Sequence, residues 1–345
     1  MNPSSSLRVL FDQRCEAPFR QVFGHPLFET VTSGDEADAI LFEKDDYPHI
    51  RDSSLYARWP EKCLTITEED VPGFFLPGIY ANNRRHFLSR GRTQTYNYFV
   101  AQRFFHNPKF EPERQSAPAK QYLVAFVGGS TSWLRKRLFR LAPTLIANDV
   151  LIRCTNNYYH WDTSESHRPL KERMRDEYTE ILARSSFFLC PRGVGASGGI
   201  RLFETMQMGV CPIIIADTYI LPNGPDWPQF ALLVSEAELP RLIEIARRHV
   251  SEAQARGQRA REAWEAYFSE AQHAPMLARL IRELLVQRDS SRERRIRFIY
   301  PFYHAWVKTR ERLRAFARNS ILGFFRLVKF RFPYQLNRSD DKGKG

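Results

Sequence analysis

Short apolar runs separated by polar stretches dominate the first hundred residues of the chain. Residues 8–11, 39–42 and 63–67 each have the length and composition of a buried strand, and the polar segments between them leave room for helices. From residue 107 to 121 the sequence changes to proline, serine and charged residues, which is typical of a linker between domains. The pattern predicts a first α/β domain over residues 1–115.

Strands and helices alternate more regularly after the linker. The predicted strands cover residues 122–127, 150–154, 187–190 and 211–216, and helical spacing covers residues 171–184, 200–208 and most of 239–288. The last of these strands is so apolar that both of its faces should be covered. This alternation predicts a doubly wound parallel sheet, and therefore a second α/β domain over residues 116–288.

The charge of the chain is concentrated at its end. The net charge is +12, but residues 288–345 hold sixteen Lys and Arg against five Asp and Glu, which leaves about +1 for the rest. The basic part is therefore a tail, residues 289–345. The nearly neutral body argues against a general nucleic-acid-binding role, and we expect no nucleic-acid partner.

Composition and cysteine usage indicate a cytoplasmic protein. Hydrophobic residues make up 43% and charged residues 26%, as in soluble globular proteins. The five cysteines are scattered without a CxxC pair, which favours reduced thiols. No signal peptide is evident, and no apolar run reaches the roughly 18 residues of a membrane span.

One segment combines a strand, a glycine-rich loop, a helix and a second strand, over residues 187–217. Backbone N–H groups of the loop 193–199, which includes Gly193, Gly195 and Ser197, and of the helix start can approach a phosphate closely. A guanidinium from Arg192 or Arg201 would add positive charge. A carboxylate at Glu204, three residues after Arg201, could accept hydrogen bonds from ribose hydroxyls. Asp217 closes the second strand at its carboxyl end. Together these residues favour a ligand that carries phosphate.

Two other interpretations of this segment remain open. Such a loop is often only a turn, Arg192 could simply pair with a carboxylate, and Glu204 could complement a helix dipole. Residues 193–198 also satisfy GxGxxG, and Asp217 follows at about the spacing of a dinucleotide fingerprint, which would indicate an NAD(P)-dependent oxidoreductase. Pro191 and Arg192 interrupt the junction between strand and glycines, so the oxidoreductase is the second choice.

At this point the sequence resembles the exostosin-like glycosyltransferases, in the form of a compact bacterial-type member. The similarity extends over about residues 40–285 and is carried by CPRG at 190–193, RLFETMQMG at 201–209, CPIIIAD at 211–217, residues 221–222, 226–227 and 234–240, FVGG at 126–129, RKRLFRL at 135–141, and residues 62–63 and 75–80. By comparison with the long animal and plant members, we expect this chain to lack their amino-terminal membrane anchor and much of their first domain.

The resemblance implies a GT-B type fold, with two Rossmann-like domains facing a cleft and a helical basic tail. It also implies transfer of a sugar from a UDP- or GDP-linked donor to a glycan or lipid-linked acceptor in surface polysaccharide synthesis. The transfer would invert the anomeric carbon and need no cofactor or metal, in agreement with the absence of a DxD triplet. Arg192, the loop amides and Arg201 would stabilise the diphosphate leaving group, and Glu204 would hold the ribose.

An inverting reaction also requires a general base that takes the proton of the acceptor hydroxyl. The base should come from the amino-terminal domain, and Asp70, which follows the strand 63–67, is the preferred candidate. The others are Glu69, Asp45, Asp46 and His86.

Arginines alternate with aromatic and aliphatic residues in the tail, between residues 292 and 332. This composition fits a helix on an anionic membrane surface, which would hold a cytoplasmic enzyme at the inner face of the membrane. A helix packed back on the first domain is the plainer alternative. A non-catalytic adaptor that binds membrane or RNA through the tail is a third function.

Overall fold

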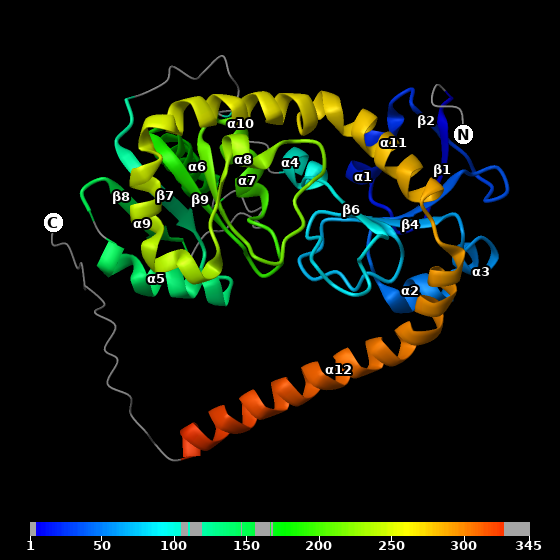
Figure 1. The fold of residues 1–345 in the computed structure, drawn as a ribbon. Coiled ribbons are helices and arrows are strands. Elements are labelled where there is room, and N and C mark those ends of the chain that lie inside the picture. Colours follow the sequence, from blue (N-terminus) through cyan, green and yellow to red (C-terminus); the bar gives the residue numbers. More distant parts are fainter. Residues whose placement is uncertain are drawn as a thin grey trace. The chain divides into compact units, whose positions relative to one another are not determined.

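The computed structural model describes residues 5–104, 110, 119–145, 147–155, 166 and 168–327, without the side chains of 102–104 and 314–327. The chain divides into two compact units, residues 1–290 and 291–345. The expected boundary at residue 115 and most of the linker 107–121 lie outside the described residues. Within the first unit, the strands form two separate sheets, one before and one after that linker (Figure 1).

The first sheet has six parallel strands in the order β2-β1-β3-β4-β5-β6. The strands are β1 (Leu7–Phe11), β2 (Phe28–Thr30), β3 (Ala39–Phe42), β4 (Cys63–Thr67), β5 (Gly78–Tyr80) and β6 (Thr93–Thr95). The helices between them are α1 (Ala17–Gln21), η1 (Val22–Gly24), α2 (Tyr47–Asp52) and α3 (Ser54–Arg58), and α4 (Phe99–Phe104) follows β6. The three strands predicted from apolar runs are confirmed, and they lie side by side at the centre of this sheet.

The second sheet has five parallel strands in the order β11-β10-β9-β7-β8. The strands are β7 (Tyr122–Gly128), β8 (Val150–Cys154), β9 (Ser185–Pro191), β10 (Cys211–Ile215) and β11 (Leu232–Leu233). The helices are α5 (Trp133–Leu145), α6 (Arg168–Ala183), α7 (Ile200–Gln207), α8 (Trp227–Phe230), η5 (Glu236–Arg241), α9 (Leu242–Arg248), η6 (Val250–Glu252) and α10 (Ala253–Tyr267).

Both faces of the second sheet are covered, as the apolar strands predict. Phe187 and Leu189 of β9 pack in one buried cluster with residues of α5, η5 and α9. Phe188 points to the other face, where it packs with residues of α6, and Cys190 packs with residues of α7 and α10. Alternate residues of one strand thus enter opposite cores, which explains the continuous apolar runs of β9 and β10.

The helix α11 (Glu270–Val286) returns from the second sheet to the first, where it packs against β5, β6 and η1 (Figure 1). Tyr96 Oη donates a hydrogen bond of 3.0 Å to the Tyr267 carbonyl oxygen, and Asn97 Nδ2 donates one of 3.0 Å to that of Phe268. We expected α11 to belong to the second domain, but it completes the core around the first sheet.

Two doubly wound parallel sheets confirm the predicted α/β fold of GT-B type. In each sheet the first strand lies between the second and the third, so the strand order reverses there. The last helix, α12 (Ser290–Leu327), carries most of the basic tail. Among the described residues, no helix is both long enough and apolar enough to span a bilayer.

Candidate active site

The strand order of the second sheet reverses between β7 and β9. Two glycine-containing loops meet at the carboxyl ends of these strands, residues 128–132 after β7 and residues 192–199 after β9. Ser132 Oγ in the first loop donates a hydrogen bond of 2.9 Å to the Arg192 carbonyl oxygen in the second. Doubly wound sheets bind their ligands outside the strand ends at this position. The loops therefore mark the candidate site.

Two guanidinium groups lie beneath these loops. Arg135 of α5 is 4% exposed and donates to the Pro191 carbonyl oxygen from Nε at 3.3 Å and Nη2 at 3.1 Å. Arg201 of α7 is half-buried and donates from Nε to the Val127 carbonyl oxygen at 2.9 Å. Within the part of the chain that the structure describes, neither group forms an ion pair with a carboxylate. Each guanidinium is held by backbone oxygens instead.

The two positive charges act on each other. Burial and, to a smaller extent, the nearby charge of Arg201 lower the pKa of Arg135 to about 9. Arg135 still carries its proton at neutral pH, because about 9 lies above 7. A buried pair of like charges is unfavourable unless an anion joins it. The site is therefore suited to a phosphate group.

Glu204 lies on α7 one turn after Arg201. Tyr178 of α6 donates its hydroxyl proton to Glu204 Oε2 at 2.8 Å. Burial raises the pKa of Glu204, while the Arg201 charge and the Tyr178 hydrogen bond oppose that rise. The structure thus confirms that Arg201 and Glu204 share a helix face, and it leaves Oε1 of the carboxylate without a partner among the described residues.

Arg192 is engaged with a carboxylate in this structure. Its Nε and Nη2 donate to the two oxygens of Glu236 at 2.6 and 3.1 Å, and both side chains are largely buried. The Glu236 backbone N–H donates to Asp217 Oδ1 at 2.9 Å. Arg192 and Asp217 are thus brought together through Glu236. Of the two interpretations of Arg192, the structure therefore contains the plainer one, a pair with a carboxylate.

The loop 193–199 packs against the first sheet. A Cβ atom on Gly195 would collide with Asn82 Oδ1, which follows β5, and would lie 2.5 Å from the Asp70 carbonyl oxygen. The Ser197 hydroxyl is 1% exposed and lies 2.9 Å from Asn82 Oδ1 and 2.5 Å from Tyr98 Oη. Gly195 and Ser197 therefore join the two halves of the unit. The predicted contact of Ser197 with a nucleotide-sugar donor would have to form from this buried position.

Asp70, the preferred base, lies at the same junction. Its backbone oxygen faces Gly195, and its side chain is exposed. Partial burial raises the pKa of the Asp70 carboxyl, and the Arg135 guanidinium acts in the opposite direction. Asp70 is thus a carboxylate on the first-domain side that lies within electrostatic reach of the two-arginine site.

The other base candidates are engaged with neighbouring protein groups. Burial raises the pKa of Asp45 to about 7 and lowers that of His86 to about 4. Asp45 accepts hydrogen bonds from the Phe74 and Phe75 backbone N–H groups, and Glu69 accepts them from the Asp45 N–H and the Thr67 hydroxyl. Asp46 forms an ion pair with Arg14, and the His86 ring stacks on the ring of Phe74. Each of these side chains already has a role in holding the loops after β3 and β4.

Sequence inspection missed three residues of this site: Arg135, Tyr178 and Glu236. Arg135 comes six residues after Gly129, in the first turn of α5, so the strand-glycine-helix pattern of residues 187–208 occurs there a second time. The helical spacing of residues 171–184 predicts a helix, and nothing in it marks Tyr178 as a site residue. No sequence signal pairs Glu236 with Arg192, because the contact depends on how η5 packs beside β9.

Comparisons with known proteins cover the part of the chain that contains both glycine loops. Residues 87–249, which contain both glycine loops, match the Exostosin GT47 domain. An exostosin-1 homolog of Caenorhabditis elegans is 32% identical over 168 residues, 44% of this chain and 42% of that protein. Human exostosin-2 is 31% identical over 169 residues, 46% of this chain and 22% of that protein. A probable glucuronosyltransferase of Oryza sativa is 36% identical over 87 residues, 25% of this chain and 19% of that protein.

The matched segments span less than half the length of each of these relatives. A solved glycosyltransferase from Rickettsia africae aligns over 82% of this chain and 99% of its own, at 12% identity and a TM-score of 0.43. The domain match and the sequence relatives confirm the predicted resemblance. Of the functions considered from the sequence, they support the glycosyltransferase and not the oxidoreductase. Residues 87–249 are thus similar to the Exostosin GT47 domain, and the sequence relatives are exostosins and a probable glucuronosyltransferase.

Proposed function

We propose that this chain transfers a sugar from a nucleotide-sugar donor to a glycan or lipid-linked acceptor in the synthesis of a cell-surface polysaccharide. The observation that carries the proposal is the pair Arg135 and Arg201, two guanidinium groups without carboxylate partners at the reversal point of the second sheet. A nucleoside diphosphate would supply the negative charge that this pair lacks.

The diphosphate would be bound where its charge increases during the reaction. As the bond between the sugar and the diphosphate breaks, the leaving group gains negative charge, and fixed guanidinium groups stabilise that charge without rearranging. Loop amides such as that of Gly195 would add donors, whereas the Gly193 N–H already donates to the Ser197 carbonyl oxygen at 3.0 Å. Arg192 would join them only by exchanging the Glu236 carboxylate for phosphate, because its fork is occupied. In this scheme cationic side chains take the place that a metal ion has in other transferases.

Glu204 and Asp70 would have separate roles. The free Oε1 of Glu204 would accept a hydrogen bond from a ribose hydroxyl, while Tyr178 holds the other oxygen. Asp70 would take the proton of the acceptor hydroxyl as that oxygen attacks the anomeric carbon from the face opposite the leaving group, which inverts the configuration. Asp217 would act through Glu236, by holding the segment that pairs with Arg192.

The basic tail would hold the enzyme at an anionic membrane surface, on the cytoplasmic side. This membrane role is supported by a row of exposed aromatic side chains on α12, where Phe298 is 74%, Phe302 71% and Trp306 56% exposed. The spacing of four residues sets them on one side of the helix. Such a face, bordered by arginines, suits the boundary between headgroups and acyl chains.

The test is thermal unfolding of the full chain with UDP, GDP, their sugar conjugates and NADH. A ligand at about 100 times its Kd adds roughly 2.7 kcal/mol, enough to raise Tm by a few degrees. We expect one nucleoside diphosphate to raise Tm, and we expect Arg135→Gln/Arg201→Gln to abolish the rise. Arg247→Gln/Arg248→Gln on the exposed side of α9 is the matched control, because those two arginines lie outside the site.

Other outcomes would favour the alternatives. A rise with NADH alone would indicate a dinucleotide-dependent oxidoreductase. No rise with any nucleotide would leave a non-catalytic adaptor, which would bind its partner through the tail.

A further inference from the structure

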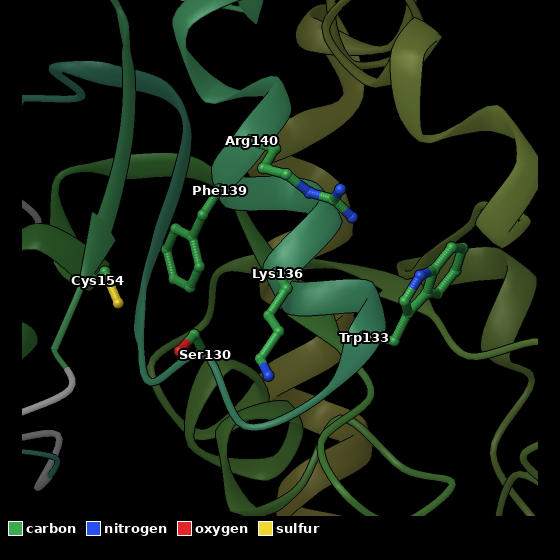
Figure 2. A pocket seen from close by; sticks show the side chains of 6 residues that line it. All are labelled: Ser130, Trp133, Lys136, Phe139, Arg140 and Cys154. Carbon is green, nitrogen blue, oxygen red and sulfur yellow. The ribbon is translucent and has the colours of Figure 1, made fainter. Parts of the chain in front are cut away.

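A second hollow lies on the other side of β7, outside the site described above. It has a volume of about 500 Å³ and is lined by Ser130, Trp133, Lys136, Phe139, Arg140 and Cys154 (Figure 2). Ser130 follows β7 and Cys154 ends β8, and the other four side chains belong to α5. The loop after β7 therefore forms a wall shared with the two-arginine site, which lies toward β9.

Two positive charges line this hollow without a carboxylate. Lys136 and Arg140 are four residues apart on α5, so their side chains lie one helical turn apart on the same side. Within the described ranges neither forms an ion pair, whereas Arg137 between them donates to the Glu236 carbonyl oxygen. Two such cations match a ligand with a charge near −2, and a phosphate monoester carries about −1.5 to −2 at neutral pH. A carboxylate would compensate only one of them.

Most of the rest of the lining is apolar. Trp133 is 57% exposed, with the Arg137 guanidinium 5.6 Å from its ring centroid, and Phe139 lines the side of the hollow toward Cys154. In the view of Figure 2, the Lys136 side chain extends between Trp133 and Phe139. Aromatic side chains with a few polar groups are the usual lining of sites for small organic ligands. The ligand should therefore have a ring as well as a phosphate.

We propose that this hollow binds a phosphorylated sugar, with the phosphate between Lys136 and Arg140 and the sugar ring against the aromatic side chains. The choice of a sugar among ring-bearing phosphates rests on the proposed glycosyl transfer. The wall shared with the two-arginine site would bring the bound sugar beside the donor. The site would then recognise the phosphate that an acceptor carries.

The experiment is a calorimetric titration of the full chain with glucose 6-phosphate, glucose 1-phosphate, glucuronate and glucose. We expect a phosphorylated sugar to bind, glucuronate to bind more weakly and glucose not to bind. Lys136→Gln/Arg140→Gln should weaken binding about tenfold or more, because two charge-assisted contacts are lost. Trp133→Ala should weaken it as well. The control Arg247→Gln/Arg248→Gln should leave it unchanged.

Several results would overturn the inference. These are equal binding of glucose and the phosphates, tighter binding of glucuronate, or unchanged affinity in Lys136→Gln/Arg140→Gln. The same titration with UDP and GDP separates this site from the proposed donor site. Nucleotide binding without sugar phosphate binding would remove only the second site. Sugar phosphate binding without nucleotide binding would count against the donor site instead.

Discussion

The Arg192–Glu236 pair is the most informative single contact of the site, because it opposes the role proposed for Arg192. Glu236→Gln removes the negative charge and weakens the two hydrogen bonds from Arg192, so the Arg192 guanidinium becomes available to phosphate. We expect the nucleoside diphosphate to bind a few-fold more tightly to this variant, and Arg192→Ala to bind it about tenfold more weakly, as expected for a lost charge-assisted hydrogen bond. Calorimetric titration measures both. Unchanged affinity in both variants would mean that Arg192 is structural.

Glu204 allows a prediction about pH. Because burial raises its pKa in the folded state, the folded protein binds a proton at this position more tightly than the unfolded chain does. Deprotonation therefore costs stability as the pH rises through the raised pKa, and the carboxyl contributes most favourably at acidic pH. We expect Glu204→Gln to unfold at a higher Tm than the wild-type protein at pH 7.

The same substitution should remove the proposed contact with ribose. Nucleotide affinity of Glu204→Gln should fall at pH 7 although the protein is more stable, and the difference in Tm should shrink toward pH 4. Tyr178→Phe is the matched control for the hydrogen bond alone, because it keeps the carboxylate. A Glu204→Gln variant that is both less stable and unimpaired in nucleotide binding would contradict this account.

At the scale of elements, the loop 193–199 is held by the close approach of its backbone to the first sheet. Gly195→Ala would drive a methyl group into Asn82 Oδ1, so we expect a loss of about 1–3 kcal/mol in the free energy of unfolding. A Cβ atom at Gly193 would meet nothing closer than the Arg135 guanidinium at 3.5 Å, so Gly193→Ala should cost far less. Urea denaturation compares the two. Equal losses would show that the junction does not depend on Gly195.

Most of the strands that the sequence predicts bury a continuous apolar run, and only the partly buried β1 and β8 do not. β3, β4, β9 and β10 have every or nearly every residue buried, and their runs of aliphatic and aromatic residues are visible in the sequence. The strands β2, β5, β6 and β11 are two or three residues long, and they form because a neighbouring strand edge is available for pairing. Whether these short strands form depends on pairing with distant parts of the chain, which no local sequence pattern shows.

The candidate site follows the same rule. Arg192, Arg201 and Glu204 were found because they share a short segment with the glycine loop. Arg135 comes from another helix, more than fifty residues earlier, and Glu236 comes from a later one. A site assembled at a reversal point draws on both neighbouring strands, so sequence inspection of one loop identifies only half of it.

At the scale of the whole molecule, the net positive charge of the chain lies almost entirely in its tail. The exposed aromatic side chains of α12 lie at positions 298, 302 and 306, and Arg310 lies over the Trp306 ring at 5.3 Å. If this face inserts into the boundary of an anionic bilayer, Phe298→Ser/Phe302→Ser/Trp306→Ser should reduce binding to vesicles that contain phosphatidylserine by about tenfold or more. Cosedimentation of the full chain with such vesicles measures the effect.

Two controls separate the contributions of apolar area and charge to this binding. Val250→Ser changes an exposed apolar residue in the first unit and should leave vesicle binding unchanged. Raising the salt from 0.1 to 1 M shortens the Debye length from about 10 to 3 Å, so binding that depends on arginines should weaken although the aromatic face remains. Binding that persists in the triple variant and disappears in salt would assign the attraction to charge alone. In that case the aromatic row would have to cover another apolar surface, since an exposed row of this kind is costly to leave in water.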